Sequence, residues 1–331
     1  MSTERDEGYR QRACNFAIDA LTAEVASAFA GEGIGTVVLK GPVLAKWLYP
    51  GEVRPYGDSD LMVAPGNRAH AVGVLERLGF VEHCPWMPTP ACVDPGGTPF
   101  SRGGAMVDLH CQLQGLDGDP DAIWGCFAAS AERQVIGGVE LCVPGRDTVL
   151  LHVVLHAAQH AYQVDGKPLE DLRRALARVE ESKWSGALEL ARAYRGVPAF
   201  AAGLRLLPEG GDLLRRLDLG EVRSLRRELR RENNVIAEEL YALLCADAGI
   251  GRKLAIAASD VFPRPDYMRW WSPLARRGKL GLAGAYLWRA IWVIGEAPGA
   301  IHTLWRVRRG KVRALSYGGG RARRRRRRQW R

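Results

Sequence analysis

Several features that would assign this 331-residue chain to a common class are absent from its sequence. The seven cysteines are an odd number and include no Cys-x-x-Cys pair, which argues against a disulfide framework and a zinc ribbon. The charged segment Met1 to Arg12 lacks the apolar core of a secretory signal. No uncharged apolar run approaches the roughly 18 residues that a membrane-spanning helix needs. We therefore expect a cytoplasmic protein without disulfide partners.

Acidic residues are scarce only near the C-terminus. Residues 264–331 contain 19 Lys and Arg against 2 Asp and Glu, a net charge of +17, whereas residues 1–263 carry a net charge of −7. The same segment holds six of the ten tryptophans and the run Arg323 to Arg328. Interleaved Trp and Arg suit an anionic membrane surface or nucleic acid equally well. For the arginine run alone, a solvated, disordered tail is the first interpretation.

Two aspartates, Asp58 and Asp60, stand one residue apart at the start of an apolar segment. Side chains alternate along a strand, so both carboxylates would point to one face. Mg²⁺ is commonly held by such carboxylates together with substrate phosphates. The alternative is an ordinary turn, because Gly-Asp-Ser-Asp is also typical turn composition.

A turn upstream of this pair, Lys40-Gly41, ends an apolar strand expected over residues 35–39 and begins a helix expected over residues 43–49. Glycine lets the backbone approach a ligand closely, and the first N–H groups of a helix attract anions. A Lys-Gly turn beside an Asp-x-Asp strand therefore indicates phosphate chemistry. For Lys40 the alternative is a surface charge, and for Arg54 it is a weak surface ion pair.

A third carboxylate lies in the alternating segment 105–113, where Met106, Asp108, His110 and Gln112 share a face. Asp108 would complete the oxygen cage that two-metal phosphoryl or nucleotidyl transfer requires. A solvent-facing strand edge is the alternative.

The rest of the chain is expected to be mostly helical, apart from a hairpin at Gly137-Gly138 between two apolar runs. A strongly apolar helix over 146–161 carries His152, His156 and His160 along one stripe. Packing and hydrogen bonding explain this stripe better than a zinc site, and a second interpretation places His156 or His160 in the cleft beside the carboxylates. We predict three parts: an α+β domain (1–145), a helical domain (146–263) and a basic, Trp/Arg-rich tail (264–331).

Several short motifs occur in a distinctive order: Leu39-Lys40-Gly41, Tyr49-Pro50, Arg54-Pro55-Tyr56-Gly57-Asp58-Ser59-Asp60, Leu78-Gly79-Phe80, Val107-Asp108-Leu109-His110, Leu155 to His160, and Asp171-Leu172-Arg173-Arg174. In this order they resemble the uncharacterised bacterial nucleotidyltransferase-like proteins of the DNA polymerase β superfold. The resemblance implies a small mixed sheet with flanking helices, followed by a helical domain. It also implies an NTP site that uses Mg²⁺ or Mn²⁺.

The resemblance implies that Asp58, Asp60 and Asp108 are the catalytic metal ligands and that Lys40 and Gly41 lie near the triphosphate. Arg54 is a further candidate for a nucleotide contact, and His110, His156 and His160 are candidates for the cleft. The expected reaction transfers a nucleoside monophosphate from an NTP to a hydroxyl or phosphate of an unidentified acceptor. The alternative is a catalytically inactive, membrane-associated accessory protein with the same fold.

Overall fold

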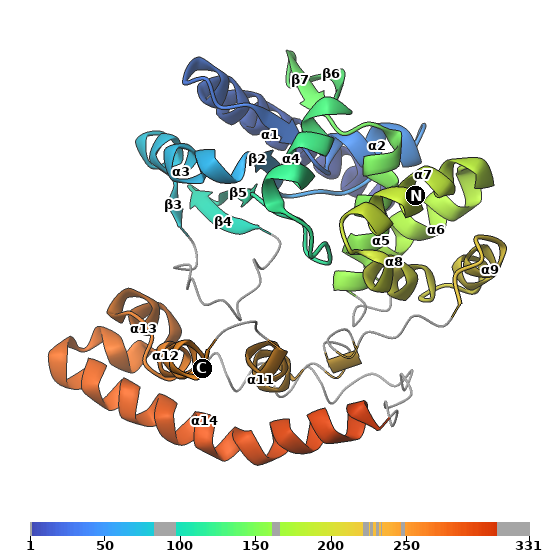
Figure 1. Cartoon of the computed structure of the whole chain (residues 1–331). Coiled ribbons are helices and arrows are strands. Elements are labelled where there is room, and N and C mark those ends of the chain that lie inside the picture. The colour runs from blue at the N-terminus through green and yellow to red at the C-terminus, as the bar shows by residue number, and fades with distance from the viewer. Residues whose placement is uncertain are drawn as a thin grey trace.

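A five-stranded mixed sheet, ordered β1-β2-β5-β4-β3, forms the centre of the first part of the chain (Figure 1). The computed structural model describes residues 2–82, 97–160, 166–220, 225, 228–229, 232, 234–245 and 249–309. Strands β2 and β5 are parallel, and the other pairs are antiparallel. The strands are β1 (Thr36–Val38), β2 (Ser59–Val63), β3 (Val81–Glu82), β4 (Thr98–Arg102) and β5 (Ala105–His110). The mixed sheet and its helices confirm the expected α+β class.

Helices flank this sheet, and the first is longer than its apolar pattern predicts. Apolar spacing predicts a helix from Asn15 to Phe29, whereas α1 spans Ser2–Gly31. The predicted half buries its face, through residues such as Leu21 and Val25. Residues 7–14 have mostly exposed side chains, so periodicity gives no signal there. The others are α2 (Pro42–Leu48), η1 (Pro65–Asn67), α3 (Arg68–Arg77) and α4 (Pro120–Ala129).

Residues 85–104 are rich in proline and glycine, which predicts a loop or an irregular hairpin, whereas residues 98–102 form the regular strand β4. It pairs in regular antiparallel register with β5, through a turn at Gly103-Gly104 in which both φ angles are positive. Pro99 argues against a strand here, because proline has no backbone N–H to donate to a neighbouring strand. Within the described residues, β3 pairs only with Phe100 and Ser101, so this pairing does not require an N–H from Pro99. The sequence also predicts a strand over residues 80–84. Strand β3 covers Val81–Glu82 of it, and residues 83 and 84 lie outside the described part of the chain.

The next part is helical after the hairpin of β6 (Glu132–Ile136) and β7 (Val139–Val143), which forms at Gly137-Gly138 as predicted. Helix α5 is buried along most of its length and packs against α6, α7 and α8. One hydrophobic core runs from Ile18 to Leu214, across the predicted boundary at residue 145. The domain division itself stays a prediction. The helices are α5 (Arg146–Gln159), α6 (Lys167–Arg178), α7 (Glu181–Ala193), α8 (Val197–Leu204) and α9 (Pro208–Arg216).

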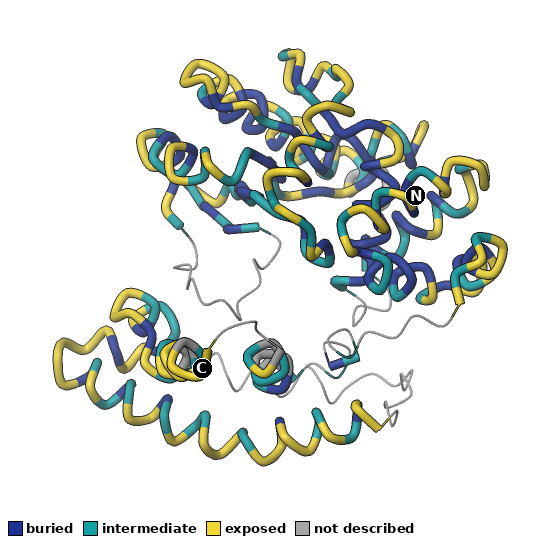
Figure 2. Tube along the Cα trace, viewed as in Figure 1, coloured by how far each residue is buried: buried dark blue, intermediate teal, exposed yellow. Residues whose placement is uncertain are grey.

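The C-terminal helices have small apolar clusters of their own, such as Met268 with Ala275 and Ala285. Residues 265–308, expected to belong to a tail, are largely helical, and α14 forms a long curved helix at the bottom of Figure 1. Figure 2 shows exposed residues recurring along α14. The arginine run lies outside the described residues. The elements are α11 (Val235–Cys245), α12 (Ile250–Val261), α13 (Pro265–Trp271), η2 (Pro273–Arg276) and α14 (Gly278–Arg308).

Among the described helices, none combines the length and apolar character needed to cross a membrane. Free thiols are found at Cys14, Cys111, Cys126 and Cys142.

Candidate active site

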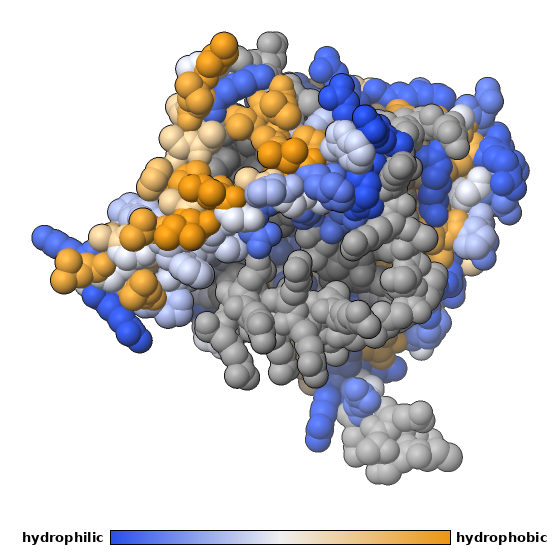
Figure 3. All heavy atoms as spheres, turned by 90° about the horizontal axis from the view of Figure 1, so that it is seen from below, coloured by the Kyte–Doolittle hydropathy of each residue, from blue (hydrophilic) through white to orange (hydrophobic). Residues whose placement is uncertain are grey.

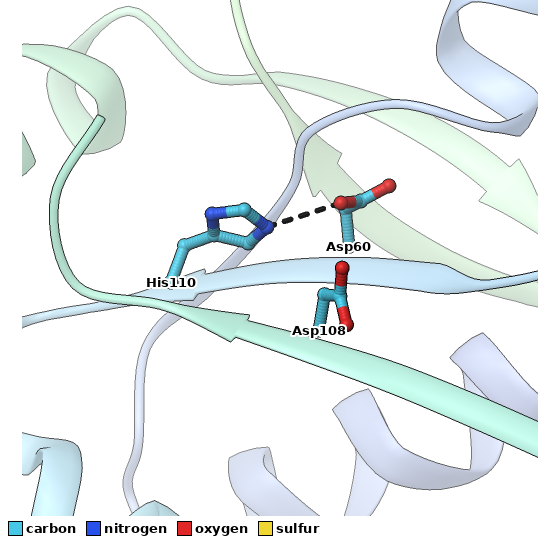
Figure 4. A group of neighbouring side chains, drawn as sticks. All are labelled: Asp60, Asp108 and His110. Atoms are coloured by element: carbon cyan, nitrogen blue, oxygen red, sulfur yellow. Dashed lines mark hydrogen bonds and ion pairs between the residues drawn. The ribbon is translucent and has the colours of Figure 1, made fainter. Parts of the chain in front are cut away.

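Two carboxylates face each other across the parallel strands at the centre of the sheet. Asp60 on β2 is the register partner of Asp108 on β5, and His110 lies two residues further along β5 (Figure 4). The alternation predicted for residues 105–113 therefore places Asp108 and His110 on one face. Potential ligand atoms of Asp60, Asp108 and His110 all lie within 4.8 Å of one another. Asp108 is not on a strand edge, because β5 lies between β2 and β4.

Lys40 supplies the positive charge closest to this pair. Its Nζ lies 2.7 Å from Oδ1 of Asp60, and its side chain is 15% exposed. The interpretation of Lys40 as a surface charge is therefore wrong. The pairing of β1 with β2 brings it here, since the Leu39 amide donates to the Asp60 carbonyl at 3.0 Å.

The ionisation of Lys40 and Asp60 follows from this contact. Burial opposes the charged form of each group, but their mutual attraction outweighs burial. The net effect raises the pKa of Lys40 and lowers the pKa of Asp60 well below its usual range. His110 adds to the second effect, because its Nε2 lies 3.0 Å from Oδ1 of Asp60.

Asp108 experiences the opposite balance. Burial raises its pKa, and the negative charges of Asp60 and Asp58 raise it further. Asp58 precedes β2 and is half-buried. It does not belong to the cluster of potential metal ligands that Asp60, Asp108 and His110 form among the described residues. The neighbouring carboxylates therefore oppose the ionisation of Asp108.

The side chains fit a divalent cation. Carboxylate oxygens are the ligands that Mg²⁺ and Mn²⁺ prefer. A cation would also relieve the repulsion that raises the pKa of Asp108. His110 Nδ1 is buried and lacks a hydrogen-bond partner among the described residues, which leaves a ring nitrogen for a bound group.

Gly41 occupies a backbone conformation that favours glycine. Its φ is 58°, in the left-handed region, and a Cβ there would lie 3.4 Å from the Tyr56 ring. The residue thus makes the turn from Lys40 into α2, which begins at Pro42 and has seven residues.

A pocket of about 210 Å³ opens beside Asp108 and Lys40. Its lining includes His110, His152, His156 and His160. Along α5 the ring centroids of His152 and His156 are 6.1 Å apart, and those of His156 and His160 are 4.8 Å apart. The histidine stripe therefore borders the pocket.

The imidazoles of His152 and His156 on α5 are neutral at neutral pH. Burial, reinforced by the charge of Lys40, lowers the pKa of His152 to about 3. The same two causes hold the pKa of His156 well below its usual range.

The close approach of β4 to this pocket depends on Gly97. A Cβ on Gly97 would lie 2.7 Å from the His110 ring, so a larger residue would displace that imidazole.

Arg54 pairs with Asp171 on α6 and not with the carboxylates of the site. Its Nε and Nη2 donate to Oδ1 and Oδ2 of Asp171 at 2.8 and 2.7 Å, and the Tyr49 hydroxyl donates to Oδ1 at 2.8 Å. Arg54 is 4% exposed and Asp171 1%, so the interpretation as a surface ion pair is wrong. Two of the three guanidinium nitrogens are thus engaged in joining the segment before β2 to α6. A nucleotide contact by Arg54 stays a prediction.

Residues 7–209 match a protein family described as uncharacterised nucleotidyltransferase. The match spans more than half of the chain, and the protein belongs to this family. A search of curated proteins gives no match.

Solved structures show distant likenesses. The antibiotic-resistance factor ANT(2'')-Ia in solution shares 16% identity over 54% of this chain and 92% of its own, with a TM-score of 0.39. Its crystal structure with adenylyl-2''-tobramycin shares 17% identity over 54% and 96%, with a TM-score of 0.36. An antigenic nucleotidyltransferase-like protein from Paracoccidioides brasiliensis shares 13% identity over 57% and 92%, with a TM-score of 0.30. The family assignment rests on the sequence match alone.

Proposed function

We propose that this protein is a divalent-metal-dependent nucleotidyltransferase that transfers a nucleoside monophosphate from an NTP to a hydroxyl or phosphate of an acceptor. The observation that carries the proposal is the register pairing of Asp60 with Asp108, with Lys40 in contact with Asp60. Membership in the nucleotidyltransferase family supports the class of reaction.

The positions of Asp60, Asp108 and Lys40 support the roles proposed for them, and Asp58 is included because of the family resemblance. Asp58, Asp60 and Asp108 would hold Mg²⁺ or Mn²⁺, which supplies positive charge for the triphosphate and the departing pyrophosphate. Lys40 is held beside them by Asp60 and can bind a phosphate oxygen as a point charge. Gly41 has no side chain to obstruct the phosphates.

The pocket lined by Asp108 and the histidines is the proposed site of the acceptor. A neutral imidazole can accept a hydrogen bond from an acceptor hydroxyl. In the transfer step the acceptor oxygen forms a bond to the α-phosphorus. The bond from that phosphorus to the bridging oxygen breaks and pyrophosphate leaves. The acceptor proton passes to a base in the pocket.

The direct test is Asp60→Asn, which keeps the shape of the side chain and removes its charge. NTPs are screened against acceptors that carry hydroxyl or phosphate groups, and pyrophosphate release is measured. We expect the substitution to lower the rate by about 10²-fold or more, because it removes several kcal/mol of transition-state stabilisation.

The matched control is Asp121→Asn, an exposed aspartate in the first turn of α4. It should retain wild-type turnover. A correctly folded Asp60→Asn protein with unchanged turnover would overturn the proposal. Absence of turnover in the wild-type protein across the screen would favour the inactive accessory protein.

A further inference from the structure

Helix α14 carries a stripe of exposed apolar side chains. Successive members are one, three, four or seven residues apart, and at 3.6 residues per turn these spacings keep them on one side of the helix. Their exposure runs from 46% for Trp305 to 90% for Leu280. Spread over about 25 residues, the stripe is about 38 Å long. Its members are Leu280, Leu287, Trp288, Ile291, Ile294, Ile301 and Trp305.

The opposite side of α14 is already used. Gly281, Ala285, Ala300 and Val307 are buried there. Helices α11, α12 and α13 pack against α14, as does η2. The helix therefore has two apolar sides, of which the protein covers one. Figure 3 shows hydrophobic side chains gathered on the lower face of the molecule, the side on which α14 lies in Figure 1.

Positive charge stands at both ends of the stripe. Arg276, Arg277 and Lys279 precede it, and Arg308 and Arg309 follow it. Arg309 lies over the ring of Trp305, 4.0 Å from its centroid. The sole acidic residue in the sequence of α14 is Glu296, which is not a member of the stripe.

We propose that this side of α14 docks the protein on an anionic lipid bilayer, with the helix along the surface. Isoleucine and leucine would enter the acyl boundary, while tryptophan and arginine suit the headgroup region. Nucleic acid would use the arginines and indoles but gains little from exposed isoleucines. If the stripe instead packed against the same stripe of a second copy of the chain, either a parallel or an antiparallel arrangement would bring basic ends together. Repulsion between these ends would oppose such a dimer. The inference is independent of whether the site turns over NTP.

The test uses the full-length protein and sedimentation with two kinds of vesicle, pure phosphatidylcholine and a 3:1 mixture of phosphatidylcholine and phosphatidylglycerol. The double substitution Ile291→Gln and Ile294→Gln removes apolar surface without changing charge. We expect it to weaken partitioning onto the anionic vesicles by about tenfold or more. Raising the salt should weaken wild-type binding as well.

The matched control is Val135→Gln, which alters an equally exposed apolar side chain on β6 and should bind like wild type. Arg308→Gln with Arg309→Gln should weaken binding to the anionic vesicles but not to pure phosphatidylcholine.

Three results would overturn the proposal. One is equal vesicle binding by the isoleucine variant and wild type. Another is binding of single-stranded RNA or DNA, with no vesicle binding, that the isoleucine substitutions leave unchanged. The third is a wild-type dimer in light scattering that those substitutions dissociate, which would assign the stripe to a second copy of this chain.

Discussion

The bidentate pair of Arg54 and Asp171 joins residues 117 positions apart, both nearly inaccessible to water. Removing one partner of such a pair leaves a buried charge without compensation. We expect Asp171→Asn to lower the free energy of unfolding by about 3–5 kcal/mol in urea denaturation. Its neighbour Glu170 forms exposed ion pairs with Arg173 and Arg174, so Glu170→Gln should cost less than about 1 kcal/mol. Similar losses in both variants would show that the buried pair adds little.

His152 should make stability depend on pH. Burial and Lys40 lower its pKa in the folded protein to about 3, while the unfolded chain takes up a proton near the ordinary value of 6.5. Its contribution to stability is therefore full above pH 6.5 and declines as the pH falls toward 3. Between pH 6.5 and pH 5 the loss is about 1–2 kcal/mol. Urea denaturation at several pH values in this range should show that the free energy of unfolding of His152→Gln depends less steeply on pH than that of the wild type. An unchanged pH dependence would contradict the attribution to His152.

At the scale of single residues, sequence reasoning placed Asp60, Asp108 and Lys40 in one region because strand alternation and motif order are local properties. It did not single out Asp171 or Tyr49 as partners of Arg54. Such partners are set by how α6 packs against α2 and the segment after it, which no periodicity reports. The signal available was indirect, since all three residues lie in motifs of the family resemblance.

At the scale of elements, the packing of α8 on α5 depends on Gly203. A Cβ there would lie 2.3 Å from the carbonyl oxygen of Val154. Gly203→Ala should therefore destabilise the protein by about 1–3 kcal/mol, since the two helices must separate. Gly211 in α9 has nothing within 4 Å of the corresponding point, and Gly211→Ala should stabilise by about 0.5–1 kcal/mol. Thermal denaturation distinguishes the two, and a loss of stability in both variants would contradict this explanation.

Elements with a turn signal or a clear apolar pattern can be predicted from the sequence, and elements without either cannot. The hairpin at Gly137-Gly138 and helix α5 follow from turn chemistry and apolar periodicity. Residues 7–14 of α1 carry no apolar signal because their side chains are mostly exposed, and Pro99 argues against a strand at β4. The high positive charge of residues 265–308 predicts a tail. The apolar periodicity of α14 is weak because the helix has two apolar sides, one packed against the protein and one exposed to solvent.

For the whole molecule, the proposed site makes the melting temperature depend on ligands. A ligand that binds only the folded state stabilises it by about 2.7 kcal/mol at 100 times its dissociation constant. Mg²⁺ or Mn²⁺ added with an NTP should therefore raise the melting temperature by several degrees, measured by calorimetry. Asp60→Asn should abolish most of the increase, and Asp121→Asn should preserve it. No increase in the wild-type protein would support the inactive accessory protein.

The parallel pairing of β2 with β5 has a consequence for how this chain can change over generations. Asp60 and Asp108 are opposed by ladder register, while α3, β3 and β4 form the crossover between them. Residues gained or lost in loops of that crossover leave the opposition intact. One residue inserted inside β5 ahead of Asp108 would turn the carboxylate to the other side of the sheet. Relatives should therefore vary in the length of this excursion but keep the spacing from Ala105 to His110.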